Sequence, residues 1–324
     1  MLILLEKAAC KCLQAAFLTW GGTECCFKTD CTNEWEPMYY DAISGGRDMK
    51  TVNKYVCSVL GMVALGLLLS SCAQKAFYYP DAVDYGNTPT RYQQPYQDVV
   101  FQSADGTALH AWFVPSRLHR NPKLAKGTVI HFHGNAQNIS SHYALVHWLP
   151  DNGYNVFTFD YRGFGSSEGK VGIADIVNDA DAALSHVRAM PEVDAQRLFV
   201  LAQSIGGNKA IAAVGRGNRA GIKAMVVDST FYGYDAIAND KFSGAGMLLN
   251  DQWSAHRYIA AISPIPVLML HGTADEVIPF AHGERLFAKA RAPKQFIAVP
   301  NGHHISALHE PVYQQQVLAW FNRY

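Results

Sequence analysis

The chain has 324 residues, with 27 acidic and 27 basic side chains and a composition that is 49% hydrophobic. The formal net charge is therefore zero, and no basic run or aromatic–basic interleaving occurs, which argues against a nucleic-acid partner. All seven cysteines lie at or before position 72, so a disulfide framework is excluded for the rest of the chain.

The first recognisable pattern begins at Met49 and has the order of an export signal. Lys50 and Lys54 precede an apolar run over residues 56–69, and small residues close the run before Cys72. The run is shorter than the roughly 20 apolar residues that cross a bilayer. It resembles a bacterial lipoprotein signal, in which Leu-Ser-Ser-Cys is cut before the cysteine.

This resemblance implies a division of the chain. Residues 1–48 are expected to be an over-extended gene start, and residues 49–71 a lipoprotein signal peptide. Residues 72–95 are expected to comprise the lipid anchor and a tether: Cys72 would carry palmitate or a similar acyl chain, and the residues after it would connect the lipid to the fold. The remaining residues, 96–324, are enough for one α/β domain with a sizeable core.

Short β-like runs alternate with helical stretches in this domain. A hairpin is predicted around Asp105-Gly106. The apolar runs that follow suit strands covered on both faces, as in a parallel sheet; they lie near 127–132, 154–159, 197–202, 224–227, 267–270 and 295–299. Helical candidates lie near 138–150, 172–190, 205–215, 280–291 and 308–322. We predict a doubly wound, mostly parallel α/β sheet with its chemistry at the carboxyl ends of the strands.

The motif Ala-Gln-Ser-Ile-Gly at positions 202–206 follows one of these runs and precedes a helical stretch. A sharp strand-to-helix turn projects a serine hydroxyl above the sheet, and small residues two before and two after it let the backbone pass. The motif matches GxSxG with Ala202 in place of the first glycine. We predict that Ser204 is a nucleophile; the alternative is a serine that caps the helix.

A serine nucleophile needs a base, and an acid that orients the base. Asp275, after the run at 267–270, is the predicted acid, with Asp228 as its rival. Asn-Gly-His-His at 301–304 follows the last run, and we predict His303 as the base because a histidine directly after glycine has the freer loop. His304 is the alternative. The later histidines His282 and His309 fall on predicted helices.

Backbone N–H groups are expected to stabilise the oxyanion. The predicted donors are Ile205 and Asn135, the latter in the loop after the run at 127–132, with Ala136 as the next choice. His131 and His133 invite a zinc interpretation, but no HExxH motif or matching carboxylate cluster accompanies them. We expect them to hydrogen-bond the surrounding loops, and we predict no metal and no cofactor.

The ordered motifs HFHGNAQN, DYRGFGSSEG, AQSIGG, HGTADEVIP and NGHH resemble the α/β-hydrolase superfamily, and within it the bud-emergence-type (Bem-like) serine hydrolases. The resemblance covers about residues 76–324 and implies an α/β-hydrolase fold with the triad Ser204, Asp275 and His303. It gives the loop at 160–165 a structural role. A short helical cap is implied at about 231–262, where the apolar content suits either an acyl-binding wall or packing.

The sequence therefore predicts a membrane-anchored serine hydrolase that cleaves an ester of a small acyl substrate. The lipoprotein signal implies a place in the bacterial cell envelope, and Ala73 after the cysteine resembles sorting to the outer membrane. A serine peptidase or amidase is the alternative within the enzymes. A non-catalytic envelope scaffold is the alternative outside them, although a scaffold would not need the full set of triad residues and glycine-bearing loops.

Overall fold

The computed structural model describes residues 77–324 and, by itself, Ser58. The predicted gene start, the predicted signal peptide apart from Ser58, and the predicted lipidation site Cys72 lie outside the described residues. The chain from Ala76 to Tyr324 forms one compact unit. Within the described residues, no helix has both the length and the apolar character needed to span a membrane.

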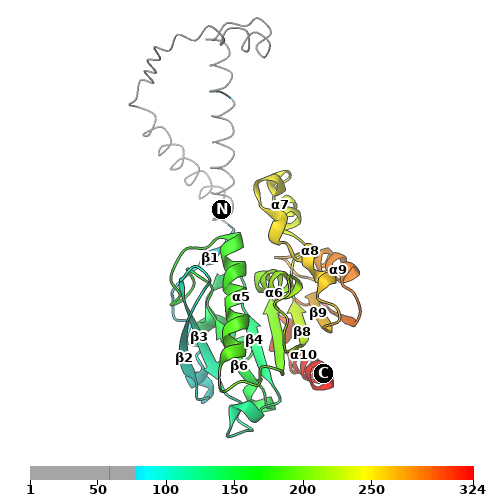
Figure 1. Cartoon of the computed structure of the whole chain (residues 1–324). Coiled ribbons are helices and arrows are strands. Elements are labelled where there is room, and N and C mark those ends of the chain that lie inside the picture. Colours follow the sequence, from blue (N-terminus) through cyan, green and yellow to red (C-terminus); the bar gives the residue numbers. More distant parts are fainter. Residues whose placement is uncertain (1–57, 59–76) are drawn as a thin grey trace, which may run out of the picture. The chain divides into compact units, whose positions relative to one another are not determined.

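An eight-stranded sheet forms the centre of this unit, in the order β10-β9-β8-β7-β4-β6-β3-β2 (Figure 1). β2 (Gln97–Gln102) and β3 (Ala108–Val114) form the predicted hairpin, and β3 is also antiparallel to β6 (Asn155–Phe159). The other neighbouring pairs are parallel. From β6 the sheet continues, strand by strand, through β4 (Thr128–Phe132), β7 (Leu198–Gln203), β8 (Ile222–Asp228), β9 (Val267–Gly272) and β10 (Lys294–Val299). The predicted fold class is confirmed.

Helices cover both faces of the sheet. Successive side chains of a strand point to opposite faces, so the apolar central strands contribute to a hydrophobic core on each face. In β7, Val200 and Ala202 belong to the core beneath one set of helices, and Phe199 and Leu201 to the core on the other face. The first set comprises α5 (Ile173–Ala189), α6 (Ile205–Gly215), α8 (Ala255–Tyr258) and α9 (Phe280–Lys289). The second comprises α4 (Ile139–His142) and α10 (Pro311–Arg323).

The predicted cap lies between β8 and β9 and is built from short helices. These are α7 (Tyr234–Lys241), η5 (Ala245–Leu248), η6 (Asp251–Trp253), α8 and η7 (Ile259–Ala261). Its apolar side chains divide into two groups. Tyr234 and Ile259 are buried in the core, whereas Phe242 and Met247 are 44% and 87% exposed. Part of the apolar content that suggested an acyl-binding wall is therefore core packing.

From Phe77 onward, the segment predicted as a tether is instead part of the folded unit. β1 (Tyr79–Pro80) pairs in parallel with β5 (Ala136–Gln137), and a 3-10 turn follows at Pro89–Tyr92. The ring of Phe77 packs edge-on against Phe231 and Tyr234 at centroid distances of 5.8 and 5.2 Å. The domain boundary predicted at residue 96 is therefore too late, because Phe77 and Tyr78 before it pack into the domain core.

Arg162, in the loop after β6, joins this loop to two other parts of the fold. Its Nε and Nη2 donate to Asp179 Oδ1 at 3.0 and 2.7 Å, and its Nη1 donates to Asp105 Oδ2 at 2.8 Å. The Asp179 side chain is completely buried and that of Arg162 is 5% exposed. These contacts support the structural role expected for the loop at 160–165.

Arg162→Ala is expected to lower the free energy of unfolding by about 3–5 kcal/mol, because the buried Asp179 carboxylate would lose its charged partner. Urea unfolding measures the loss. Arg117→Ala is the matched control, since it removes the exposed pair between Arg117 and Asp151 at 3.1 Å. Such a surface pair contributes less than about 1 kcal/mol. Similar small losses in both variants would contradict the structural role of Arg162.

Candidate active site

Ser204 lies on the tight turn between β7 and α6, as predicted. Its backbone angles, φ 54° and ψ −123°, are a strained combination for a residue other than glycine. The Ser204 N–H donates to the Asp228 carbonyl at 2.8 Å, and the Ser204 carbonyl accepts from Thr230 Oγ1 at 2.9 Å. The turn is therefore held by hydrogen bonds to the end of β8 and the residues after it.

The two glycines after Ser204 are required by close contacts of α6. A Cβ at Gly206 would lie 2.3 Å from the carbonyl oxygen of Phe132, and one at Gly207 would lie 1.8 Å from Thr230 Oγ1. Ala202 is completely buried in β7. The methyl group that replaces the first glycine of the motif is thus accommodated in the core.

His304, rather than His303, connects the serine to the acid. His304 Nε2 lies 3.0 Å from Ser204 Oγ, and its Nδ1 lies 2.9 and 3.1 Å from the two carboxylate oxygens of Asp275. The side chain of His303 is 70% exposed, and its Nδ1 lies 3.0 Å from Glu276 Oε2. The structure therefore brings Ser204 and Asp275 together as predicted and corrects the choice of histidine.

The loop that carries both histidines explains the correction. Gly302 does not give a free loop, because its N–H donates to Val299 at 3.1 Å and its carbonyl accepts from Ala274 at 3.0 Å. It also packs so closely that a Cβ on Gly272 would lie 2.1 Å from its oxygen. After this fixed point, His303 points to solvent and the next side chain, His304, points inward.

Asp275 is held in the charged form that can orient His304. Its side chain is completely buried, and Oδ1 accepts from the N–H groups of Val277 and Ile278 at 3.0 and 2.8 Å. Burial opposes the charged form, but the hydrogen bond and charge of His304 and these two amides lower the pKa of the Asp275 carboxyl. An acceptor at Nδ1 leaves the other ring nitrogen free to face Ser204.

The alternative acid and base residues have other partners. Asp228 accepts from Gln203 Nε2 and from Ser229 Oγ, both at 3.2 Å, and burial raises the pKa of its carboxyl to about 6. His282 accepts from the N–H of Tyr232 at 3.0 Å and lies 2.6 Å from Asp240. His309 ends the 3-10 turn at Ala307–His309.

The predicted oxyanion donors belong to the elements that flank Ser204. Ile205 is the first residue of α6, where N–H groups have no partner within the helix. Asn135 follows Gly134, which lies so close that a Cβ on it would be 3.7 Å from Ser204 Cβ. Ala136, the next choice, is paired with Tyr79 in the small β1–β5 sheet. The roles of Ile205 and Asn135 stay predictions.

His131 and His133 take part in separate hydrogen-bond networks. His131 contacts Thr158 Oγ1 at 3.0 Å and Gln203 Oε1 at 3.1 Å. His133 Nδ1 donates to the Gly134 carbonyl at 2.8 Å, and burial lowers its pKa well below the ordinary value. The contact of His133 agrees with the expected bond to a surrounding loop, whereas both partners of His131 lie in strands, Thr158 in β6 and Gln203 in β7.

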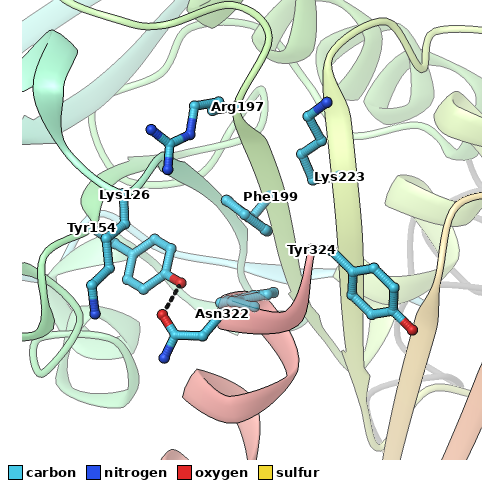
Figure 2. A pocket seen from close by; sticks show the side chains of 8 residues that line it. Lys126, Tyr154, Arg197, Phe199, Lys223, Asn322 and Tyr324 are labelled. Atoms are coloured by element: carbon cyan, nitrogen blue, oxygen red, sulfur yellow. Dashed lines mark hydrogen bonds between the residues drawn. The ribbon is translucent and has the colours of Figure 1, made fainter.

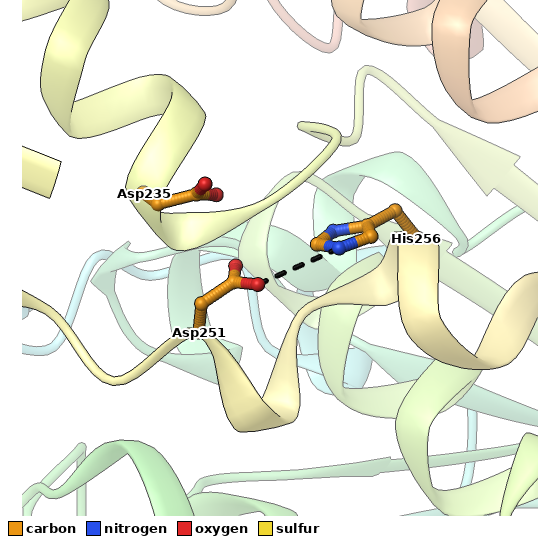
Figure 3. Close-up of side chains that lie close together, drawn as sticks. All are labelled: Asp235, Asp251 and His256. Atoms are coloured by element: carbon orange, nitrogen blue, oxygen red, sulfur yellow. Dashed lines mark ion pairs between the residues drawn. The ribbon is translucent and has the colours of Figure 1, made fainter.

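The cap contains a cluster of side chains of the types that can bind metal ions. Ligand atoms of Asp235, Asp251 and His256 all lie within 4.8 Å of one another (Figure 3). Asp251, however, already pairs with His256 Nε2 at 3.5 Å and with Arg257 Nε at 3.0 Å. These two partners compensate the charge of Asp251, so the cluster is explained as an ion-pair group that joins the short helices of the cap.

The buried histidine His131 is expected to make the protein less stable in acid. Burial lowers its pKa to about 3, whereas the pKa of an unfolded histidine is about 6.5. Below pH 6.5 the unfolded chain therefore binds more protons, and the free energy of unfolding falls by about 2 kcal/mol by pH 5 from this group. Urea unfolding at pH 7 and pH 5 measures this loss, which should be smaller in His131→Gln. An equal pH dependence in both proteins would contradict the expectation.

A cavity of about 190 Å³ lies at the end of the sheet opposite to Ser204. Figure 2 shows the side chains that line it. It is lined by Lys126, Tyr154, Arg197, Phe199, Lys223, Phe321, Asn322 and Tyr324. Lys126 and Arg197 come before β4 and β7, whereas Ser204 comes after β7. The cavity is therefore separate from the triad.

Comparisons with known proteins bear on the family of this chain. The family described as serine aminopeptidase S33 matches residues 123–258. The uncharacterized protein YfhR of Salmonella typhi is 49% identical over 249 residues, which are 74% of this chain and 84% of that protein. The α/β-hydrolase domain-containing protein WAV2 of Arabidopsis thaliana is 33% identical, over 76% of this chain and 85% of that protein. Protein bem46 of Schizosaccharomyces pombe is 28% identical, over 75% and 83%.

A solved structure shares the fold. The Pyrococcus furiosus esterase Pf2001 superposes with a TM-score of 0.61 at 19% identity, over 76% of this chain and 95% of that one. The motifs, the sheet order and these relatives point to the same family. The chain belongs to the α/β-hydrolase superfamily and, within it, is related to the Bem46- and WAV2-like α/β-hydrolase domain proteins.

Proposed function

We propose that this α/β hydrolase is a serine esterase that acts through Ser204, His304 and Asp275. The observation that carries the proposal is the hydrogen-bond chain from Ser204 Oγ through both ring nitrogens of His304 to the buried carboxylate of Asp275. A nucleophile, a base and an orienting acid in hydrogen-bond contact form the arrangement that acyl transfer requires. The reaction needs no cofactor or metal.

In the first half of the reaction, Ser204 Oγ attacks the acyl carbonyl carbon while His304 Nε2 takes the hydroxyl proton. Asp275 stabilises the resulting imidazolium, which then protonates the leaving alcohol. Water, activated by the same nitrogen, releases the acyl group from Ser204 in the second half. The N–H groups of Ile205 and Asn135 would stabilise the oxyanion in both halves, and loss of one such donor costs about 100-fold to 1000-fold in rate.

Two observations bear on the scissile bond. The structural neighbour Pf2001 is an esterase, which favours an ester, whereas the matching family is described as a serine aminopeptidase, which favours an amide. The same triad serves both reactions, because it supplies the nucleophile and the proton transfers for either leaving group. A serine peptidase or amidase is therefore the second candidate.

We also propose that the protein is anchored to the bacterial outer membrane through a lipid on Cys72. Support comes from the basic, apolar and small-residue order of positions 49–72. Metabolic labelling with palmitate tests it: the full chain should incorporate the label and the Cys72→Ala variant should not. Equal labelling of both would overturn lipidation at Cys72.

The catalytic proposal is tested by treating the full chain with a fluorophosphonate and locating the modified residue by peptide mass spectrometry. The expected result is modification of Ser204, together with hydrolysis of p-nitrophenyl esters. A series of increasing acyl length identifies the preferred chain, and matched p-nitroanilides test the amide alternative. Faster hydrolysis of the anilides would favour the amidase. An unmodified Ser204 would overturn the proposal and favour the scaffold.

A further inference from the structure

The loop that carries Asn135 is shaped by a distant segment of the chain. This segment, residues 77–87, is named here the strap, and residues 134–138 the oxyanion loop. The strap pairs with the loop as a parallel strand, Tyr79 opposite Ala136 and Pro80 opposite Gln137. In the described part of the chain, every hydrogen bond that the loop makes to a residue more than ten positions away goes to the strap.

Two asparagines supply the side-chain bonds among these contacts. Asn135 Nδ2 donates to the Phe77 carbonyl at 2.7 Å, and the Asn135 carbonyl accepts from the Tyr79 N–H at 3.4 Å. Asn138 Nδ2 donates to the Val83 carbonyl at 2.8 Å. The two ends of the loop are therefore fixed to the strap by side-chain amides, one just before β5 and one just after it.

The strap is in turn fixed to α6, the helix that carries the other expected donor. Tyr78 is buried, and its hydroxyl lies 3.2 Å from that of Tyr234. Lys209 of α6 is also completely buried; its Nζ lies 5.4 Å from the ring centroid of Tyr78 and 4.8 Å from that of Tyr234. The same segment thus contacts the elements of both expected oxyanion donors, the loop of Asn135 and the helix of Ile205.

We propose that Asn135 and Asn138 are positioning residues for the reaction, which hold the oxyanion loop on the strap so that its backbone N–H faces the oxygen formed at Ser204. This inference rests on the proposed esterase function. Stabilisation of an oxyanion depends on donors that are already in place when the charge develops. A loop released from the strap would bind the ester nearly as well but would stabilise the transition state less.

The test compares Asn135→Ala and Asn138→Ser in the full chain. The first removes the bond to Phe77 and keeps the backbone N–H. The second removes the bonds from Nδ2 to Val83 and Asp81 but retains a side-chain oxygen for the N–H of Ser140, which Asn138 caps at 2.9 Å. Asn218→Ala is the matched control, because Asn218 Nδ2 makes a similar bond to the Asp181 carbonyl, also at 2.9 Å, away from the triad.

For both loop variants, kcat on a p-nitrophenyl ester should fall by about 10-fold to 100-fold with little change in KM. Affinity for an alkyl boronic acid, whose adduct with Ser204 carries an oxygen in the same place, should fall in parallel. The pH at which kcat reaches half its maximum should not move, because the triad is untouched. Asn218→Ala should lose a similar amount of thermal stability but keep its kcat.

Three results would overturn the inference. In the first, both loop variants keep the kcat and boronate affinity of the parent, which is still modified at Ser204; only the role of the strap then fails. In the second, the loop variants lose no more kcat than Asn218→Ala at equal loss of stability, so their role is purely structural. In the third, the parent itself is neither modified nor active, so the proposed function fails and the role of the strap with it.

Discussion

Alanine at His304 is expected to lower kcat for an ester by about 10⁶-fold, and alanine at Ser204 should cost about the same, because nucleophile and base act as a unit. Alanine at His303 should leave kcat within about twofold, since its side chain is 70% exposed and pairs with Glu276 rather than with the serine. The neighbouring histidines therefore form a matched pair, one inside the hydrogen-bond chain and one outside it.

Initial rates on the preferred p-nitrophenyl ester measure this difference, and fluorophosphonate modification of Ser204 gives an independent reading. Modification should be lost in His304→Ala and retained in His303→Ala. Thermal unfolding of both variants controls for misfolding. A large loss of kcat in His303→Ala, with His304→Ala active, would show that His303, and not His304, is the base.

The sequence predicted the sheet and two members of the site because local patterns determine them. Unbroken apolar runs indicated strands covered on both faces, and the small residues around Ser204 indicated the tight turn before α6. Asp275 could be predicted because it follows the carboxyl end of β9, where side chains of a parallel sheet are expected to form a site. Each of these inferences needs only neighbouring residues and the order of elements along the chain.

The choice between His303 and His304 needed information that neighbouring residues do not carry. The loop is fixed by the contact of Gly302 with Gly272, residues thirty positions apart that meet only when β9 and β10 are paired. The rule that a residue after glycine has the freer loop was therefore wrong here. A double histidine after glycine is a signal that both residues must be considered.

The strap was missed for a related reason. The many tyrosines and prolines of residues 77–95 indicated a tether because the segment has no apolar run or period of its own. Phe77 and Tyr78 nevertheless pack beside Tyr234, a residue more than 150 positions away. A two-residue strand such as β1 is too short for a sequence pattern and forms only against the oxyanion loop.

Asparagine at position 275 is expected to lower kcat by about 10⁴-fold while leaving Ser204, His304 and the loops in place. The carboxylate of Asp275 accepts the hydrogen of His304 Nδ1, which leaves Nε2 to take the serine proton. An amide at this position can donate its own hydrogen to Nδ1, which favours the tautomer with the proton on Nε2. That tautomer cannot accept the proton of Ser204, so the loss falls on kcat.

Asp228→Asn is the matched control for Asp275→Asn, because Asp228 is equally buried and lies beside the site but contacts Gln203 and Ser229 instead of His304. Burial raises the pKa of its carboxyl to about 6, so near that pH about half of the Asp228 carboxyls are already neutral. The amide should therefore change kcat by less than about tenfold. Rates of both variants across the pH range measure the contrast. If Asp228→Asn were the more damaging of the two, the acid of the triad would have to be Asp228, because only the residue that orients His304 can control its tautomer.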